Sequence, residues 1–213
     1  MTLPPGQTAL DRFPRYGTHF RDPPPAVPAT PVLAVDGVGT LPLPLDGLPR
    51  KEVVADFHCV AGWSATGLRW EGVPLDAVLP PDDGVTHVRF HGLDGYSAVA
   101  AVEDLRADDV LLADRLDGEP LSAKHGAPLR LVSPGQYGFV SAKHLCRIEP
   151  LTREPFLGAR AAHPVAGVFL TGLGFARFTR ARVWEQERHR YLPAPIVQRY
   201  LVPLVRRPAP SRR

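Results

Sequence analysis

The sequence predicts an α+β fold that is rich in strands, with mixed sheets and short helices. Its 213 residues, 44% of them apolar, are enough to form the core of one domain. The 25 prolines and 19 glycines exceed average usage but follow no repeat. Residues of these two types punctuate turns, and the apolar runs between them have the length of strands.

Three regions follow from the composition along the chain. Residues 1–30 are polar and proline-rich, and they predict an extended arm that packs on the body. The strand signals begin at residue 31, and residues 31–151 are the expected core domain. Residues 152–213, rich in arginine, histidine and proline, are expected to complete or wrap the same domain as a carboxyl-terminal extension.

The first half of the core predicts a hairpin, two strands and a short helix. PVLAVDGVGT alternates apolar and polar residues and is broken by Asp-Gly, which is a hairpin signal. DGLPRKEVVADFHC predicts a short helix or turn over 48–53 and then a strand that runs into Cys59. GLRWEGVPLDAVL predicts a strand or turn followed by a short helix over 74–79, because proline favours the first helical position.

The second half of the core consists mainly of strand signals. THVRFHGLDGYSAVAAVEDL predicts two strands on either side of Asp94-Gly95. The Asp117-Gly118 pair predicts another turn, followed by a polar loop, a strand over 128–132 and a further strand in KHLCRIEPL. The later segment ARVWEQERHRY fits either a helix or an extended strand.

Charge and cysteine content favour a cytoplasmic protein with no nucleic-acid partner. The net charge is +3, and much of the excess lies in the tail sequence RRPAPSRR, so the body is close to neutral. The two cysteines are 87 positions apart (146 − 59) and make no disulfide framework. No signal-peptide pattern is seen, and PVAGVFLTGLGF is too short to span a membrane, which takes about 20 apolar residues.

Cys59 lies in the stretch FHCVAGWSATG. A free cysteine is most often a small buried hydrophobe, and Cys146, inside an apolar strand signal, fits that description. Cys59 differs because it ends an apolar run shortly before a glycine, and loops at strand ends are where ligands bind.

Two other kinds of site are conceivable in this stretch. A serine hydrolase at Ser64 is poorly supported, because Thr66 replaces the second glycine of G-x-S-x-G. A zinc site is also poorly supported, because adjacent strand residues point to opposite faces and the spacings are unusual. Its four ligands would be His58, Cys59, His144 and Cys146.

A second motif, KHGAPLRLVSPGQYGFVSAKHL, spans residues 124–145. A strand that reverses at Pro134-Gly135 would bring Arg130 close to Lys143. Together a planar guanidinium and an ammonium could bind a phosphate. The alternative is a solvated hairpin with ordinary surface bases.

Taken together, these stretches resemble the sulfite-oxidase-type molybdopterin-binding domain, and its bacterial reductase-like branch in particular. FHCVAGWS matches the family's R/H-C-V-x-G/A-W-S, and HGAPLRLVSPGQYGFVSAK matches G-A-P-L-R-L-V-x-P-x-x-Y-G-x-x-S-x-K. EGVPLDAVL resembles a third family segment, and the three motifs keep their order. The resemblance covers residues 31–151 and implies the sulfite oxidase molybdopterin-binding-domain fold.

The resemblance also implies a molybdenum-molybdopterin cofactor and its contacts. Cys59 would be the metal ligand, since a soft thiolate suits molybdenum held by a dithiolene. In the arm, RFPRYGTHF resembles a pterin-contact segment and implies Arg15 and Tyr16. Tyr137 is a candidate catalytic proton donor, with packing in a strand-turn as its alternative. The other implied contacts with the pterin and its phosphate are Asp94, His125, Arg130, Ser141, Ala142 and Lys143.

The implied function is a two-electron oxidoreductase with oxygen-atom transfer on a small-molecule substrate. Gly-Trp-Ser-Ala stands where sulfite oxidases have substrate-binding arginines, which argues against sulfite. No haem or flavin motif is present, so a separate electron donor or acceptor protein is expected. The alternatives are a non-catalytic or degenerate relative and a small zinc protein.

Overall fold

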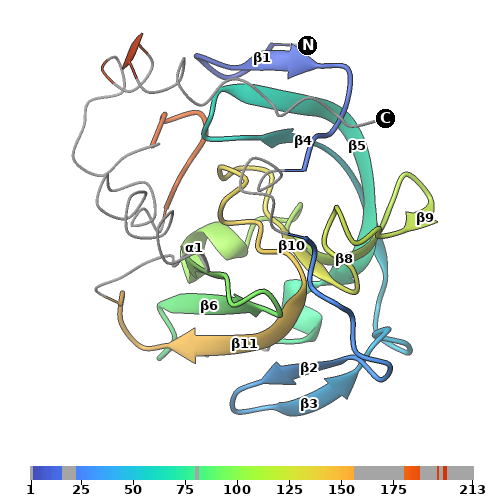
Figure 1. The fold of residues 1–213 in the computed structure, drawn as a ribbon. Helices are drawn as coiled ribbons and strands as arrows, with labels where there is room; N and C mark the ends of the chain where they lie inside the picture. The colour runs from blue at the N-terminus through green and yellow to red at the C-terminus, as the bar shows by residue number, and fades with distance from the viewer. Residues whose placement is uncertain are drawn as a thin grey trace.

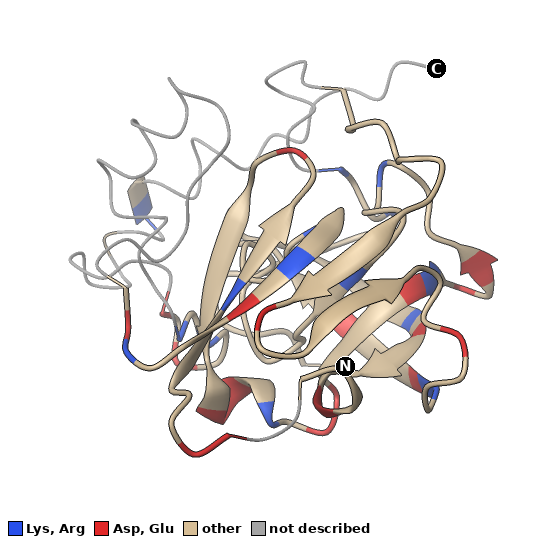
Figure 2. Cartoon of the chain, turned by 90° about the horizontal axis from the view of Figure 1, so that it is seen from below, with Lys and Arg blue, Asp and Glu red and all other residues tan. Residues whose placement is uncertain are grey.

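A computed structural model describes residues 2–15, 23–79, 82–155, 180–187, 196, 199 and 200. Strands dominate this part of the chain, and they form two mixed sheets (Figure 1). The predicted fold class, β-rich mixed sheets with short helices, is therefore confirmed. Lys and Arg positions and Asp and Glu positions are spread over several of the described elements (Figure 2).

The first sheet has six strands in the described residues and is built around the 12-residue strand β5. β1 pairs with β5 in parallel, while β4 and β8 pair with it antiparallel. β8 also pairs with β9 and with β10. The strands are β1 (Thr8–Leu10), β4 (Lys51–His58), β5 (Trp63–Pro74), β8 (Leu111–Leu116), β9 (Glu119–Pro120) and β10 (Arg130–Val132).

The second sheet has five strands in the order β3-β2-β11-β6-β7. β11 is its central strand; it pairs in parallel with β2 and antiparallel with β6. The strands are β2 (Val32–Val35), β3 (Gly39–Pro42), β6 (His87–Gly92), β7 (Ser97–Ala101) and β11 (Leu145–Leu151).

Turn signals in the sequence were good guides to these strands. The turns at Asp36-Gly37, Asp94-Gly95 and Asp117-Gly118 are all present, between β2 and β3, β6 and β7, and β8 and β9, although β9 lies where a polar loop was expected. The helix over 74–79 is confirmed in a shorter form, a 3-10 helix at Leu75–Ala77. The helix option over 48–53 is wrong, because the chain turns at residues 46–47 and enters β4 at Lys51.

Helix α1 (Val102–Leu105) and strand β1 were also not predicted. The helix has only one turn and follows β7 directly, so it carries too little periodicity to detect. β1 lies within the predicted arm and depends on parallel pairing with residues more than 50 positions away. In the described part of the chain, no helix has the length and hydrophobicity that crossing a membrane would require.

The chain alternates between the two sheets. Their strands come from consecutive stretches that belong in turn to the first and the second sheet, namely 8–10, 32–42, 51–74, 87–101, 111–132 and 145–151. A buried cluster that includes Phe90, Leu131 and Ile148 draws on strands of both sheets. A smaller cluster in the first sheet contains Cys59, Trp63 and Trp70. The segments that connect the two sheets therefore bring residues from distant parts of the sequence close together, as a binding site requires.

Candidate cofactor site

Cys59 begins the tight turn between β4 and β5. Its amide donates to the carbonyl of Trp63 at 2.8 Å, and the amide of Gly62 donates back to the Cys59 carbonyl at 2.9 Å. Gly62 has φ +90°, which favours glycine at this position. The thiol is buried, with 6% of the residue exposed, so the cysteine is at a strand end and is also part of a core.

A network of hydrogen bonds from Gln7, His58 and Ser64 stabilises this turn. Gln7 donates through Nε2 to the Cys59 carbonyl at 3.2 Å, and Ser64 Oγ donates to Gln7 Oε1 at 3.1 Å. His58 Nδ1 lies 2.7 Å from Ser64 Oγ and, because that hydroxyl donates to Gln7, we assign the ring proton to Nδ1. Ser64 is fully buried and gives its proton to an amide, so the geometry does not support a serine hydrolase.

Arg130 is the most deeply buried cation of the candidate site. Only 1% of the residue is exposed, and aromatic rings surround its guanidinium. The guanidinium carbon lies 4.9 Å from the ring centroid of Trp70, 5.4 Å from that of Phe57 and 5.7 Å from that of Phe13. Such contacts favour a desolvated cation by about 2 kcal/mol or more.

The hydrogen bonds of Arg130 all go to neutral carbonyls. The acceptors are the backbone oxygens of His125, Leu131 and Ser141, at 2.9, 3.4 and 3.4 Å. In the described part of the chain no carboxylate pairs with this side chain, and burial lowers its pKa to about 9. A buried charge without a counter-charge is costly, so this position favours an anion.

Lys143 and His125 lie beside Arg130. Burial, followed by the charge of Arg130, lowers the pKa of Lys143 to about 8 and that of His125 to about 4. A Cβ on Gly126 would lie 3.1 Å from Arg130 Cβ and 3.2 Å from Lys143 Cβ, so a glycine permits the close approach. Phe13 stacks on the His125 ring, with centroids 4.6 Å apart. The predicted grouping of Arg130 with Lys143 is thus present.

The charges of Asp94 and Arg15 both act on the ammonium group of Lys143. Both influence the pKa of Lys143, Arg15 by lowering it and Asp94 by raising it. Asp94 Oδ1 also accepts from the amide of Tyr96 at 3.1 Å in the β6–β7 turn. Arg15 follows β1 and Asp94 lies in the second sheet, so segments of both sheets contribute. Tyr16, predicted beside Arg15, lies outside the described residues.

His144 is a member of the site that sequence reasoning considered only as a zinc ligand. It is 1% exposed, and its Nδ1 lies 2.7 Å from the carbonyl of Ala127, so Nδ1 carries the proton. Nε2 is then a buried acceptor without a hydrogen-bond partner among the residues that the structure describes. Burial is the main cause that lowers its pKa. Its place directly after Lys143 in the second motif was the available signal.

The remaining predicted residues are engaged inside the protein. Ser141 Oγ accepts from the amide of Ser133 at 3.2 Å, and the Ala142 carbonyl accepts from Leu131 at 2.9 Å. Tyr137 is fully buried, and its hydroxyl donates to the carbonyl of Val183 at 3.4 Å. Its role in proton transfer stays a prediction, and the geometry agrees with the packing alternative.

A zinc site receives no support from the described residues. No three histidine, cysteine, aspartate or glutamate side chains come together there. His58 and His144 direct Nδ1 to other partners, and Cys146 Sγ lies 3.5 Å from the carbonyl of His91. The donor set instead combines a thiolate for a soft metal with the buried Arg130 and the half-buried Lys143 for an anion. It fits a phosphate-bearing molybdenum cofactor.

Comparison with known proteins identifies the domain. Residues 40–158 match the family model for the oxidoreductase molybdopterin binding domain. The chain belongs to this family. The predicted resemblance and the molybdenum-molybdopterin cofactor of the domain are thereby confirmed. The assignment of individual residues of this molybdopterin-binding domain to cofactor contacts stays a prediction.

Relatives of this molybdopterin-binding domain include oxidoreductases of several bacteria. The chain is 33% identical over 176 residues to the protein-methionine-sulfoxide reductase catalytic subunit of Xanthomonas campestris, covering 70% of this chain and 54% of that protein. It is 37% identical over 109 residues to the uncharacterized oxidoreductase YuiH of Bacillus subtilis, covering 50% and 54%. The chain spans about half the length of these curated relatives.

A solved structure, that of the sulfane dehydrogenase SoxCD from Paracoccus pantotrophus, is also similar. The TM-score is 0.48 with 25% sequence identity, and the match covers 58% of this chain and 38% of that chain.

Proposed function

We propose that this chain is a molybdenum-cofactor-dependent oxidoreductase that transfers an oxygen atom in a two-electron reaction on a small substrate. In the reducing direction the balance is substrate-O plus two protons and two electrons, giving substrate and water. The observation that carries the proposal is Arg130, a buried cation with a neighbouring lysine and no carboxylate partner in the described residues. A phosphate-bearing cofactor supplies the charge that this position lacks.

In this proposal one side chain of the site binds the metal, and the others bind the pterin and its phosphate. When bound, the cofactor supplies a metal centre that exchanges two electrons. The Cys59 thiolate binds the metal and tunes its potential. Arg130 and Lys143 hold the phosphate, while Asp94 and the buried acceptor of His144 bind polar groups of the pterin. Gln7, through the Cys59 carbonyl, fixes the turn that presents the thiolate.

A neutral oxo donor is the substrate class that we propose, with sulfoxides first. The name of the Xanthomonas relative, a methionine-sulfoxide reductase, supports this choice. The turn after Cys59 carries no cationic side chain from 60 to 65. Trp63 and Ser64, at the positions of the sulfite-binding arginines, are both buried. This turn therefore offers little attraction to an anionic substrate.

A separate electron-transfer protein completes the proposal. The same relative is named a catalytic subunit, which supports a partner that supplies or accepts electrons. The cytoplasmic location expected from the sequence is kept as part of the proposal. Each turnover of the substrate uses two electrons, which the partner protein would deliver together or one at a time.

The experiment compares the two cysteines in a host that makes molybdenum cofactor. We expect about one molybdenum per chain in the wild type and a thiolate-to-molybdenum absorption band. Cys59→Ser should lose that band and most sulfoxide reduction with an artificial reductant. Cys146→Ser is the matched control, because it removes the other free cysteine, and it should keep both.

Three results would overturn parts of this proposal. Stoichiometric zinc, or neither metal nor pterin, would remove the cofactor assignment. A band that persists in Cys59→Ser would remove the metal ligand. Full molybdenum loading without turnover of any oxo donor or acceptor would favour a non-catalytic cofactor-binding protein.

A further inference from the structure

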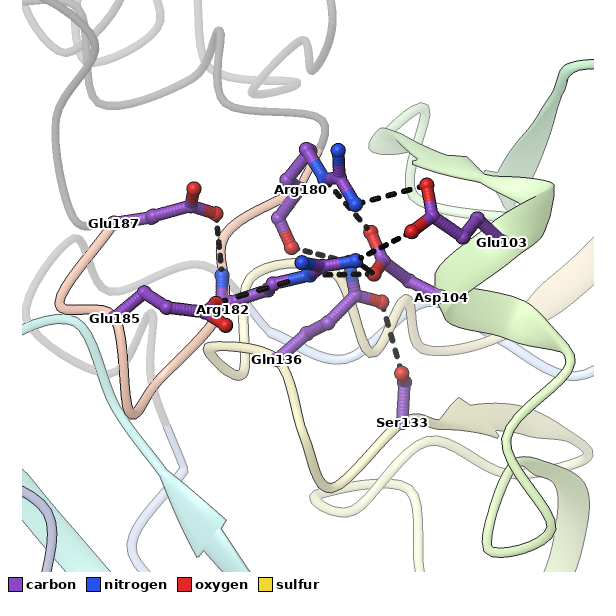
Figure 3. Close-up of polar contacts among 8 residues, drawn as sticks. All are labelled: Glu103, Asp104, Ser133, Gln136, Arg180, Arg182, Glu185 and Glu187. Atoms are coloured by element: carbon purple, nitrogen blue, oxygen red, sulfur yellow. Dashed lines mark hydrogen bonds and ion pairs between the residues drawn. The ribbon is translucent and has the colours of Figure 1, made fainter.

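A distant segment of the chain, residues 180–187, lies against the loop that follows β10 (Figure 3). Arg182 forms an isolated antiparallel bridge with Gln136. The amide of Tyr137 donates to the Ala181 carbonyl at 2.8 Å, and the amide of Val183 donates to the Gly135 carbonyl at 3.0 Å. The 180–187 segment thus acts as a short extra strand beside loop 133–138.

Ion pairs fix the 180–187 segment to helix α1. Arg182 Nε donates to Asp104 Oδ1 at 2.7 Å, and its Nη2 donates to Glu103 Oε1 at 3.2 Å. Arg180 Nη2 lies 2.9 Å from the second oxygen of Glu103. The Asp104 side chain is only 7% exposed, so its pairing with Arg182 is shielded from solvent. Removing one partner of such a pair leaves a poorly solvated charge.

The contact between segment and loop is also apolar. Ala181 and Val183 are completely buried and belong to the same core cluster as Tyr137. The Tyr137 hydroxyl donates to the Val183 carbonyl, so the aromatic side chain spans the contact. Gln136 adds a side-chain hydrogen bond to the Arg180 carbonyl and accepts from Ser133.

The opposite side of the same loop touches the strand that carries the candidate metal ligand. The amide of Gly138 donates to the carbonyl of His58 at 2.8 Å, next to Cys59. The Phe57 ring packs directly on Gly138, since a Cβ there would lie 2.0 Å from a ring carbon. Loop 133–138 is therefore held between the 180–187 segment on one side and the end of β4 on the other.

We infer that Arg182 is a positioning residue for the Cys59 turn, acting through loop 133–138 and not by contact with substrate or cofactor. The inference rests on the proposed function of Cys59 as metal ligand. Arg182 joins helix α1 to the segment, the segment pairs with Gly135 to Tyr137, and Gly138 then holds the carbonyl of His58. Loss of the Arg182 ion pairs makes loop 133–138 more mobile, and the Cys59 thiolate is then held less firmly in the position that binds the metal.

The first test uses protein without cofactor and measures hydrogen exchange of the Tyr137 and Gly138 amides. In Arg182→Ala we expect exchange to rise about tenfold or more, from the loss of charge-assisted hydrogen bonds. Arg147→Ala is the matched control, because Arg147 makes a similar two-point contact with Asp36 at 3.0 and 2.6 Å elsewhere. Arg182→Lys should restore part of the protection.

The second test uses molybdenum-loaded protein and the thiolate-to-molybdenum band. At equal molybdenum content, the band should shift or weaken in Arg182→Ala and stay unchanged in Arg147→Ala. If Arg182→Ala does not fold, Asp104→Asn replaces it, since that variant keeps the shape of the side chain and removes its charge.

The outcomes separate the inference from the proposed function. Unchanged exchange at Tyr137 and Gly138 in Arg182→Ala overturns the role of the segment. Increased exchange with an unaltered band overturns the coupling to Cys59. Wild-type protein without molybdenum overturns the proposed function, and the exchange experiment still decides whether Arg182 holds the loop.

Discussion

His125 is a neutral side chain held among cations. Burial, then the charges of Arg130 and Lys143, lowers its pKa to about 4 from an ordinary value of 6.5. Its ring stacks on Phe13, which belongs to the amino-terminal arm. Protonation would add a fourth positive charge to a site that already holds the buried Arg130, the half-buried Lys143 and Arg15.

This shift predicts acid sensitivity of the cofactor-free protein. Between pH 6.5 and 4 the unfolded chain binds a proton at this position that the folded chain does not, so folding stability falls as the pH falls. His125→Gln should flatten the dependence in this window. Urea unfolding at pH 7, 6 and 5 measures the slope, and an identical slope in variant and wild type would contradict the placement of His125.

Candidate site residues could be named from the sequence where a motif contains them, and their roles stay predictions. Cys59, Arg130 and Lys143 come from motifs whose residue types already suit a soft metal and a phosphate. The positions of His144 and Phe13 in the candidate site were not predicted, because they depend on long-range packing. The tautomer of His144 is set by a carbonyl 17 positions away, and Phe13 reaches Arg130 only after the arm has docked.

At the scale of elements, loop 133–138 is fitted tightly to β4. Gly138→Ala would force a methyl group into the Phe57 ring, at 2.0 Å from a ring carbon. Overpacking of this kind costs about 1–3 kcal/mol of folding free energy. Gly135→Ala, three residues earlier in the same loop, has nothing within 4 Å and should be nearly neutral. Chemical unfolding of both variants tests this, and equal stabilities would refute the tight fit.

Elements with local signals were the ones that the sequence predicted well. Asp-Gly pairs produce turns by their own backbone preferences, so the hairpins of both sheets were found. For residues 48–53 the sequence predicted a short helix or a turn, and the helix option was wrong because pairing of β4 with β5 overrides a weak local pattern. The sequence left open whether ARVWEQERHRY forms a helix or a strand. The structure describes this segment only as far as residue 187; within it Arg182 forms an isolated β-bridge and a turn follows.

At the scale of the whole molecule, the site draws on both sheets. Cys59 and Arg130 lie on strands or turns of the first sheet, whereas Asp94 and Lys143 adjoin strands of the second. An anion bound between Arg130 of the first sheet and Lys143 beside the second sheet should therefore stabilise the entire fold. Sequence motifs could name these residues, but not show that they come from different sheets.

Inorganic phosphate is a simple probe of that linkage. It should raise the melting temperature of the cofactor-free wild type, and at 100 times its dissociation constant the gain is about 2.7 kcal/mol. Arg130→Met should abolish the gain, while Arg147→Met, at an exposed pair, should retain it. A thermal shift of equal size in all three proteins would show that phosphate binds elsewhere.

The position of β11 has a consequence for synthesis of the protein. β11 is the central strand of its sheet, yet it is made after every other strand of either sheet in the described residues. Until residues 145–151 leave the ribosome, the β2–β3 and β6–β7 hairpins have no common neighbour to join them. Lys143 and His144, directly before β11, are fixed at the same moment. If Lys143 and His144 hold the molybdenum cofactor as proposed, it can be loaded only after nearly the whole domain is made, although the proposed metal ligand at position 59 is made much earlier.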